Sequence, residues 1–129
     1  MTEDIDDRVN RFLRSLEAFD FTAARQMCTE TATVRQNDGR GERPIKESLE
    51  QLETLSAELD VLDYDILRRF RDPGEVLQQH VLHLVGKDGS RRDVHAVVHF
   101  RFQEGLIDRI EESVYPEPGL TRPSTPDPS

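Results

Sequence analysis

The chain has a single cysteine, Cys28, and no tryptophan among its 129 residues. A lone cysteine forms no intramolecular disulfide and supplies no cysteine cluster for a metal. No apolar run approaches the roughly 20 residues that span a bilayer. The opening letters, MTEDIDDR, are acidic and lack the pattern of a secretory signal. We therefore expect a soluble cytoplasmic protein with no membrane partner.

Positive charge is also scarce, with 17 Lys and Arg against 26 Asp and Glu, for a net charge of -9. A field of this sign repels phosphate backbones and argues against a nucleic acid partner. The length and the 35% hydrophobic content predict one domain with room for a core and a pocket. We assign residues 1–116 to this domain. Residues 117–129, rich in proline and without apolar periodicity, are predicted to form a flexible tail.

Helical and alternating apolar patterns predict the elements before residue 75. A first helix is expected from about Asp4 to Phe19, and Asp20 is suited to cap a second, shorter helix. A short strand should cover residues 31–36. Pro44 suits the first turn of a third helix. A further strand should alternate through residues 62–70.

The rest of the domain is predicted to form three antiparallel strands. Residues 76–85 and 93–102 are rich in β-branched and large apolar side chains, and Asp88-Gly89 between them is a strong hairpin signal. Residues 103–105 should close a second hairpin. The order helix, helix, strand, helix and four strands separates helices from strands. This order predicts an α+β fold in which a curved antiparallel sheet wraps over about three helices.

Turn lengths then predict which side chains face the core. A two-residue loop at Asp88-Gly89 would set His83 opposite Val94, and a three-residue loop at 103–105 would bring Glu112 to the same face. His83 and Glu112 would be the ionisable groups on this apolar wall. The opposite, outer face would carry Leu82, Leu84, His95, Val97 and His99.

The phrases TATVRQN, FRFQEGLI and RIEESVYP, with this element order, resemble the nuclear transport factor 2-like superfamily, in its SnoaL-like and ketosteroid isomerase-related branch. The resemblance covers about residues 4–116. It implies a cystatin-like cone, in which a bent, mixed sheet closes over helices around an internal apolar pocket. It also implies a homodimer formed through the outer sheet face.

The resemblance to steroid isomerases fails at the catalytic groups. Those enzymes use a tyrosine on the first helix, a basic aspartate after the first strand and a protonated aspartate in the penultimate strand. The matching positions here are Phe12, Gln36 and Val98. The chain is therefore not expected to be a standard steroid isomerase.

His83 and Glu112 remain as candidate catalytic residues. An imidazole titrates near neutral pH, and a carboxyl group in an apolar wall has a raised pKa. The structural alternative makes His83 a core histidine and pairs Glu112 with an arginine such as Arg25, Arg35 or Arg68. A metal site is not expected, because His95 and His99, four residues apart on a strand, are separated by roughly 13 Å.

Two functions stay open at this point. One is a cofactor-independent isomerase, lyase (dehydratase) or cyclase that moves protons on a small hydrophobic molecule. The other is a non-catalytic module that binds such a ligand or only dimerises. In either case we expect the pocket to be lined by Phe12, Leu16, Gln36, Tyr64, Val81, Val85, Ala96, Val98, Phe100, Ile110 and Val114.

Overall fold

The computed structural model describes residues 4–116. The tail predicted for residues 117–129 lies outside this range. None of the helices in the described part has the length and apolar character needed to cross a membrane.

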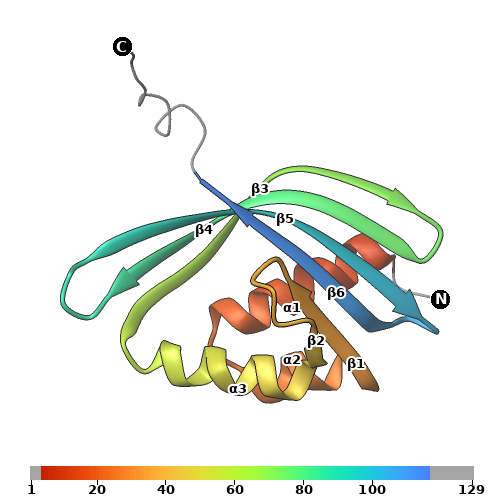
Figure 1. Cartoon of the computed structure of the whole chain (residues 1–129), viewed down its shortest axis with the longest axis horizontal. Coiled ribbons are helices and arrows are strands. Elements are labelled where there is room, and N and C mark those ends of the chain that lie inside the picture. The colour runs from red at the N-terminus through yellow and green to blue at the C-terminus, as the bar shows by residue number, and fades with distance from the viewer. Residues whose placement is uncertain (1–3, 117–129) are drawn as a thin grey trace, which may run out of the picture.

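Three helices lie on one side of the sheet (Figure 1). Helix α1 spans Ile5–Glu17, and α2 spans Phe21–Gln26 and begins where the Asp20 side chain accepts a hydrogen bond from the Ala23 amide at 3.1 Å. Helix α3 spans Ile45–Ser56 and starts directly after Pro44. The apolar stripes of α1 and α3 are buried against the sheet, as their spacing predicts.

Six strands form one mixed sheet in the order β2-β1-β6-β5-β4-β3. Their bounds are β1 Cys28–Gln36, β2 Glu42–Pro44, β3 Leu59–Asp72, β4 Glu75–Gly86, β5 Arg91–Gln103 and β6 Leu106–Tyr115. Strand β1 runs parallel to β6, and the other pairs are antiparallel. Figure 1 shows the sheet arching over the helices, and the α+β prediction is confirmed. The short β2 was not predicted.

The predicted register of the β4–β5 hairpin is wrong by one residue. His83 pairs with Asp93, not Val94, and Val85 pairs with Arg91. The Gly86 amide donates to the Ser90 carbonyl at 2.8 Å, so the loop has three residues, with Gly89 at φ +87°. A turn followed by a left-handed glycine uses an Asp-Gly pair as readily as a two-residue loop does.

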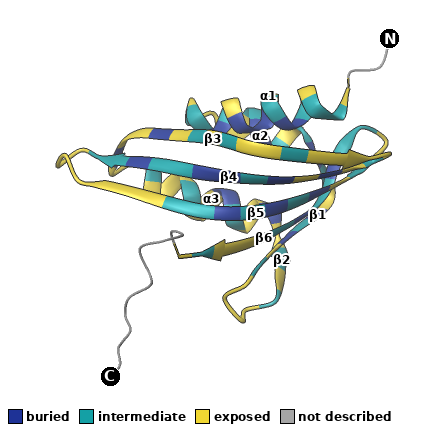
Figure 2. Ribbon diagram, turned by 90° about the horizontal axis from the view of Figure 1, so that it is seen from above, coloured by how far each residue is buried: buried dark blue, intermediate teal, exposed yellow. Residues whose placement is uncertain are grey.

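This shift turns every side chain of β4 to the opposite face of the sheet. Gln78 and His80 point toward the helices and are only 1% and 2% exposed, and Figure 2 shows the buried stretch along β4. Leu82 and Leu84 also face inward, against the prediction. Val81, His83 and Val85 lie on the outer face instead of the pocket side.

The β5–β6 hairpin also differs from its prediction, yet Glu112 still faces inward. Its loop has two residues, Glu104 and Gly105, both at positive φ, which is the geometry of a tight hairpin turn. An irregularity in the ladder lets Arg101 pair with Arg109 while the next residue pairs with Ile107, so β6 carries one extra residue. The shorter loop and the bulge compensate, and Glu112 lies opposite Val98.

Candidate functional site

A cavity of about 360 Å³ lies between the sheet and helices α1 and α3. Its wall is mostly apolar, and the polar side chains that reach it come from α3 and from strands β1, β3, β4, β5 and β6. Of the residues predicted to surround a pocket, the structure places these around the cavity: Phe12, Leu16, Gln36, Tyr64, Val98, Phe100, Ile110, Glu112 and Val114.

Four predicted residues do not line this cavity. Val81, His83 and Val85 lie on the outer face because of the hairpin register. Ala96 faces inward but is packed within the core with no exposed surface. The His83 side chain is 38% exposed, and its Nδ1 lies 2.8 Å from Asp93 Oδ1. That carboxylate, through its hydrogen bond, raises the pKa of His83.

His80 takes the place on the wall that His83 was predicted to hold, and the sequence analysis missed it. The same turn is also compatible with a three-residue loop, Lys87-Asp88-Gly89, and considering that loop length would have identified His80. With that loop, the alternation of β4 turns Gln78, His80, Leu82 and Leu84 inward together.

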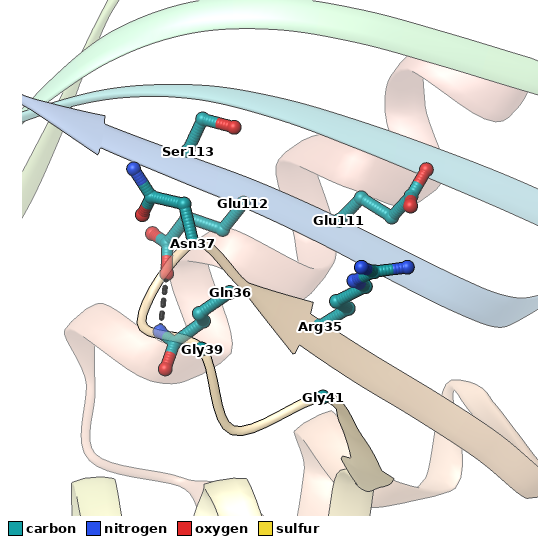
Figure 3. Close-up of a pocket in the computed structure, with 8 residues that line it drawn as sticks. All are labelled: Arg35, Gln36, Asn37, Gly39, Gly41, Glu111, Glu112 and Ser113. Carbon is teal, nitrogen blue, oxygen red and sulfur yellow. Dashed lines mark hydrogen bonds between the residues drawn. The ribbon is translucent and has the colours of Figure 1, made fainter.

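Glu112 is held by an amide, not by an arginine. Gln36 Nε2 donates to Glu112 Oε1 at 2.5 Å, as the dashed line in Figure 3 shows. Gln36 Oε1 in turn accepts a hydrogen bond from Arg43 Nη2 at 2.9 Å. The arginine has only donors, so it fixes which end of the Gln36 amide faces Glu112. The alternative pairing of Glu112 with an arginine such as Arg25, Arg35 or Arg68 is not found among residues 4–116.

Burial raises the pKa of Glu112, and the hydrogen bond from Gln36 partly opposes that rise. The same two residues also line a second hollow of about 410 Å³, between the end of β1 and β6 (Figure 3). Gln36 and Glu112 therefore line both the cavity and this second hollow.

Tyr64 and His80 form a second polar group on the wall. Their rings meet edge to face, with centroids 5.1 Å apart. Burial, with the negative charges of Glu112 and Glu17, raises the pKa of Tyr64 above its usual range, so its phenol keeps its proton. Burial and the nearby Arg69 lower the pKa of His80 to about 4, so its imidazole is neutral at physiological pH.

Some of the residues predicted for the outer face of the sheet lie there, and others do not. His95, Val97 and His99 lie there with His83, whereas Leu82 and Leu84 do not. His99 Nε2 lies 2.7 Å from Glu75 Oε1. Within residues 4–116 no three metal-binding side chains converge into a metal site.

The model of the SnoaL-like domain family matches residues 9–110. The chain belongs to the SnoaL-like family. This SnoaL-like domain is similar to AclR from Streptomyces galilaeus, with a TM-score of 0.76 and 13% identity over 91% of this chain and 92% of that one. An NTF2-like protein from Cytophaga hutchinsonii matches with a TM-score of 0.71 and 17% identity, covering 93% and 97% of the two chains.

An LEH-like epoxide hydrolase from M. tuberculosis is also similar to the SnoaL-like domain, with a TM-score of 0.71 and 18% identity over 84% of this chain and 80% of that one. No curated protein sequence matches the chain. At these identities the likeness to solved structures shows a shared fold, and the activity has to be argued from the site.

Proposed function

We propose that the cavity binds a small, largely apolar molecule and that Glu112 exchanges a proton with it. The observation that carries this proposal is the position of Glu112. Its carboxyl group lies on an apolar wall, has a raised pKa and contacts an amide where a structural ion pair would have an arginine. A pKa moved toward neutrality suits a group that both takes and returns a proton.

The two carboxyl oxygens of Glu112 have different surroundings. Oε1 accepts the Gln36 hydrogen bond, which fixes the carboxyl plane, while Oε2 accepts no hydrogen bond from the described residues. Oε2 is therefore the atom that would take a proton from a ligand and give it back at a second position. Isomerisation, elimination of water and ring closure all use such a step, so the proposal covers an isomerase, a lyase or a cyclase that needs no cofactor.

Two other titratable groups of the wall, Tyr64 and His80, support this assignment. Tyr64 keeps its proton, and His80, whose pKa of about 4 lies below the raised pKa of Glu112, is the weaker base, so neither competes with Glu112. Phe12 and Val98 are apolar members of the wall and offer substrate packing only.

A ligand search followed by a matched pair of variants tests the proposal. Mass spectrometry of the purified protein and thermal-shift screening would identify molecules that occupy the cavity. With such a molecule, Glu112→Gln should lower turnover by roughly two to four orders of magnitude. Glu111→Gln is the control, because Glu111 is the neighbouring residue on the outer side of β6, where it pairs with Arg109 at 3.0 Å. Equal turnover in the two variants would refute the role of Glu112.

A non-catalytic binding module is the second candidate. The apolar side chains of Phe12 and Val98, where steroid isomerases carry polar catalytic groups, favour it. In that case the wild-type protein would bind the ligand without converting it, and Glu112→Gln would change affinity only.

A further inference from the structure

A buried row of polar side chains runs from helix α1 to the cavity. Arg69 Nε and Nη2 lie 3.0 and 2.7 Å from Gln78 Oε1, and Gln78 Nε2 lies 2.9 Å from His80 Nδ1. Arg69 is itself held by Asn10, whose Oδ1 accepts from Nη2 at 2.9 Å. Gln78 and His80 are almost fully buried, so the hydrogen bond between them is shielded from water.

The order of donors and acceptors in this row fixes the His80 tautomer. A guanidinium group has only donors, so the Gln78 oxygen must face Arg69 and the Gln78 amide nitrogen must face His80. An N–H group that points at Nδ1 requires Nδ1 to be the acceptor. The ring proton of the neutral His80 imidazole therefore sits on Nε2.

That Nε2–H group has no partner in the part of the chain that the structure describes. The atom is buried, and His80 lines the cavity. A buried donor without an acceptor is costly, so such a group calls for a bound water or a ligand atom as its partner. The Ser48 hydroxyl on α3 is a second cavity atom without a described partner.

We propose that His80 presents its Nε2–H to the cavity as the hydrogen-bond donor for a carbonyl or hydroxyl oxygen of the ligand, and that Arg69 holds it in this tautomer through Gln78. This inference rests on the proposed function and adds a chemical class to it. The ligand is an oxygen-bearing, otherwise apolar molecule, with its oxygen oriented toward β4.

The sheet places His80 where its hydrogen bond to the ligand oxygen would assist proton transfer to Glu112. The two residues lie two strands and two positions apart on the same face, roughly 12 Å between Cα atoms, and both side chains extend inward. A molecule of one or two rings reaches both. When Glu112 Oε2 takes a proton from the carbon beside a ketone, the C–H electron pair forms the new C=C bond and the carbonyl π pair moves to oxygen. The Nε2–H group stabilises that oxygen without transferring its proton.

Nitrogen NMR of the full chain tests the tautomer without any ligand. Long-range proton–nitrogen spectra near pH 7 distinguish a protonated from an unprotonated ring nitrogen, and the spectrum of His80→Gln identifies the His80 signals. We expect Nε2 protonated and Nδ1 bare in the wild type. In Gln78→Glu an acceptor replaces the amide donor, so the proton should move to Nδ1. A wild-type ring protonated at Nδ1 would overturn the proposal.

Two probes that differ only in the oxygen test the donor itself. The affinities of 1-indanone and indane would be measured by NMR titration of the wild type, His80→Phe and His80→Gln. The ketone-to-hydrocarbon affinity ratio should be roughly 3- to 10-fold higher in the wild type than in His80→Phe. His80→Gln, which keeps an N–H at similar reach, should retain part of this preference. Gln78→Glu should lose it if NMR shows Nε2 without its proton.

The proposal remains testable even if His80→Phe does not fold. If NMR shows that Nε2 has lost its proton in Gln78→Glu, an unchanged ketone-to-hydrocarbon affinity ratio in that variant would overturn the proposal. So would the absence of any effect of 1-indanone on the His80 signals at millimolar concentration. The same ratio measured in Glu112→Gln separates the two proposals. It should be unchanged, because the donor role of His80 does not depend on proton transfer by Glu112.

Discussion

Gln36 and Gln78 lie in one row across the sheet, separated by Glu112 and Val98. The side-chain oxygen of each glutamine accepts a hydrogen bond from an arginine, and the amide nitrogen of each faces a titratable group on the cavity wall. The two amides have opposite consequences. The Gln36 N–H favours the charged form of Glu112, whereas the Gln78 N–H favours the neutral form of His80.

Glu112→Gln should not destabilise the protein at neutral pH. The pKa of Glu112 is raised on folding, so the folded state binds its proton more tightly than the unfolded chain, whose ordinary value is 4.5. Ionised Glu112 then costs stability, and this cost develops as pH rises from about 4.5 through the folded pKa. The difference in unfolding free energy, variant minus wild type, should grow across that window in urea titrations. Glu111→Gln is the matched control, because it makes the same change at the neighbouring carboxylate on the outer side of β6. A loss of roughly 3–5 kcal/mol in Glu112→Gln would instead indicate a buried ion pair.

His80 should make the protein acid-sensitive. Its pKa falls from 6.5 to about 4 on folding, so its contribution is complete above pH 6.5 and is lost as pH falls toward 4. The loss over this window is roughly 3 kcal/mol of unfolding free energy. His80→Gln should remove that part of the pH dependence in urea unfolding curves. His83→Gln is the control, because His83 is partly exposed and its pKa moves upward. Identical acid sensitivity in wild type and His80→Gln would contradict the burial of a neutral ring.

Gln36→Leu should raise the pKa of Glu112 further. It removes the N–H that stabilises the carboxylate and leaves the burial unchanged. A hydrogen bond to a charged group is worth enough to move the midpoint by roughly one to two pH units. Carbon NMR titration of labelled glutamate side chains measures the midpoint of Glu112 in the wild type and in the variant. Gln79→Leu, which removes a hydrogen bond to the Tyr115 hydroxyl on the outer face, should leave the Glu112 midpoint in place.

We expect the protein to be a homodimer that associates through the outer sheet face. His95, Val97 and His99 form this face, together with the partly exposed Leu77. Light scattering at micromolar concentration should give twice the chain mass for the wild type. Val97→Glu should give a monomer, because it places a charge in the middle of the face. Thr22→Glu, on the exposed side of α2, adds the same charge and should stay dimeric. A monomeric wild type would refute the expectation.

The inward faces of β5 and β6 were predicted correctly, although the hairpin that joins them was not. Apolar residues alternate along β5, and Glu112 falls on the inward side of β6 because the two-residue loop and the bulge cancel each other's effect on the register. The helices were equally readable, because each carries an apolar stripe and α2 begins at a capping Asp20. Local signals of this kind depend on residues that are close in the chain.

The face of β4 was decided only by the tertiary structure. Asp88-Gly89 marks a hairpin but is compatible with loops of two or three residues, and a change of one residue exchanges His83 for His80 on the cavity wall. Gln78 and His80 are polar, and their burial is partly offset because Arg69, on the neighbouring strand, donates to Gln78, whose amide in turn bonds His80 Nδ1. The sequence determined the fold class. Its prediction that Glu112 faces inward held only because two differences from the predicted hairpin cancel. The hydrogen-bond partners that fix the states of Glu112 and His80 come from residues brought together by folding, so only the structure could assign them.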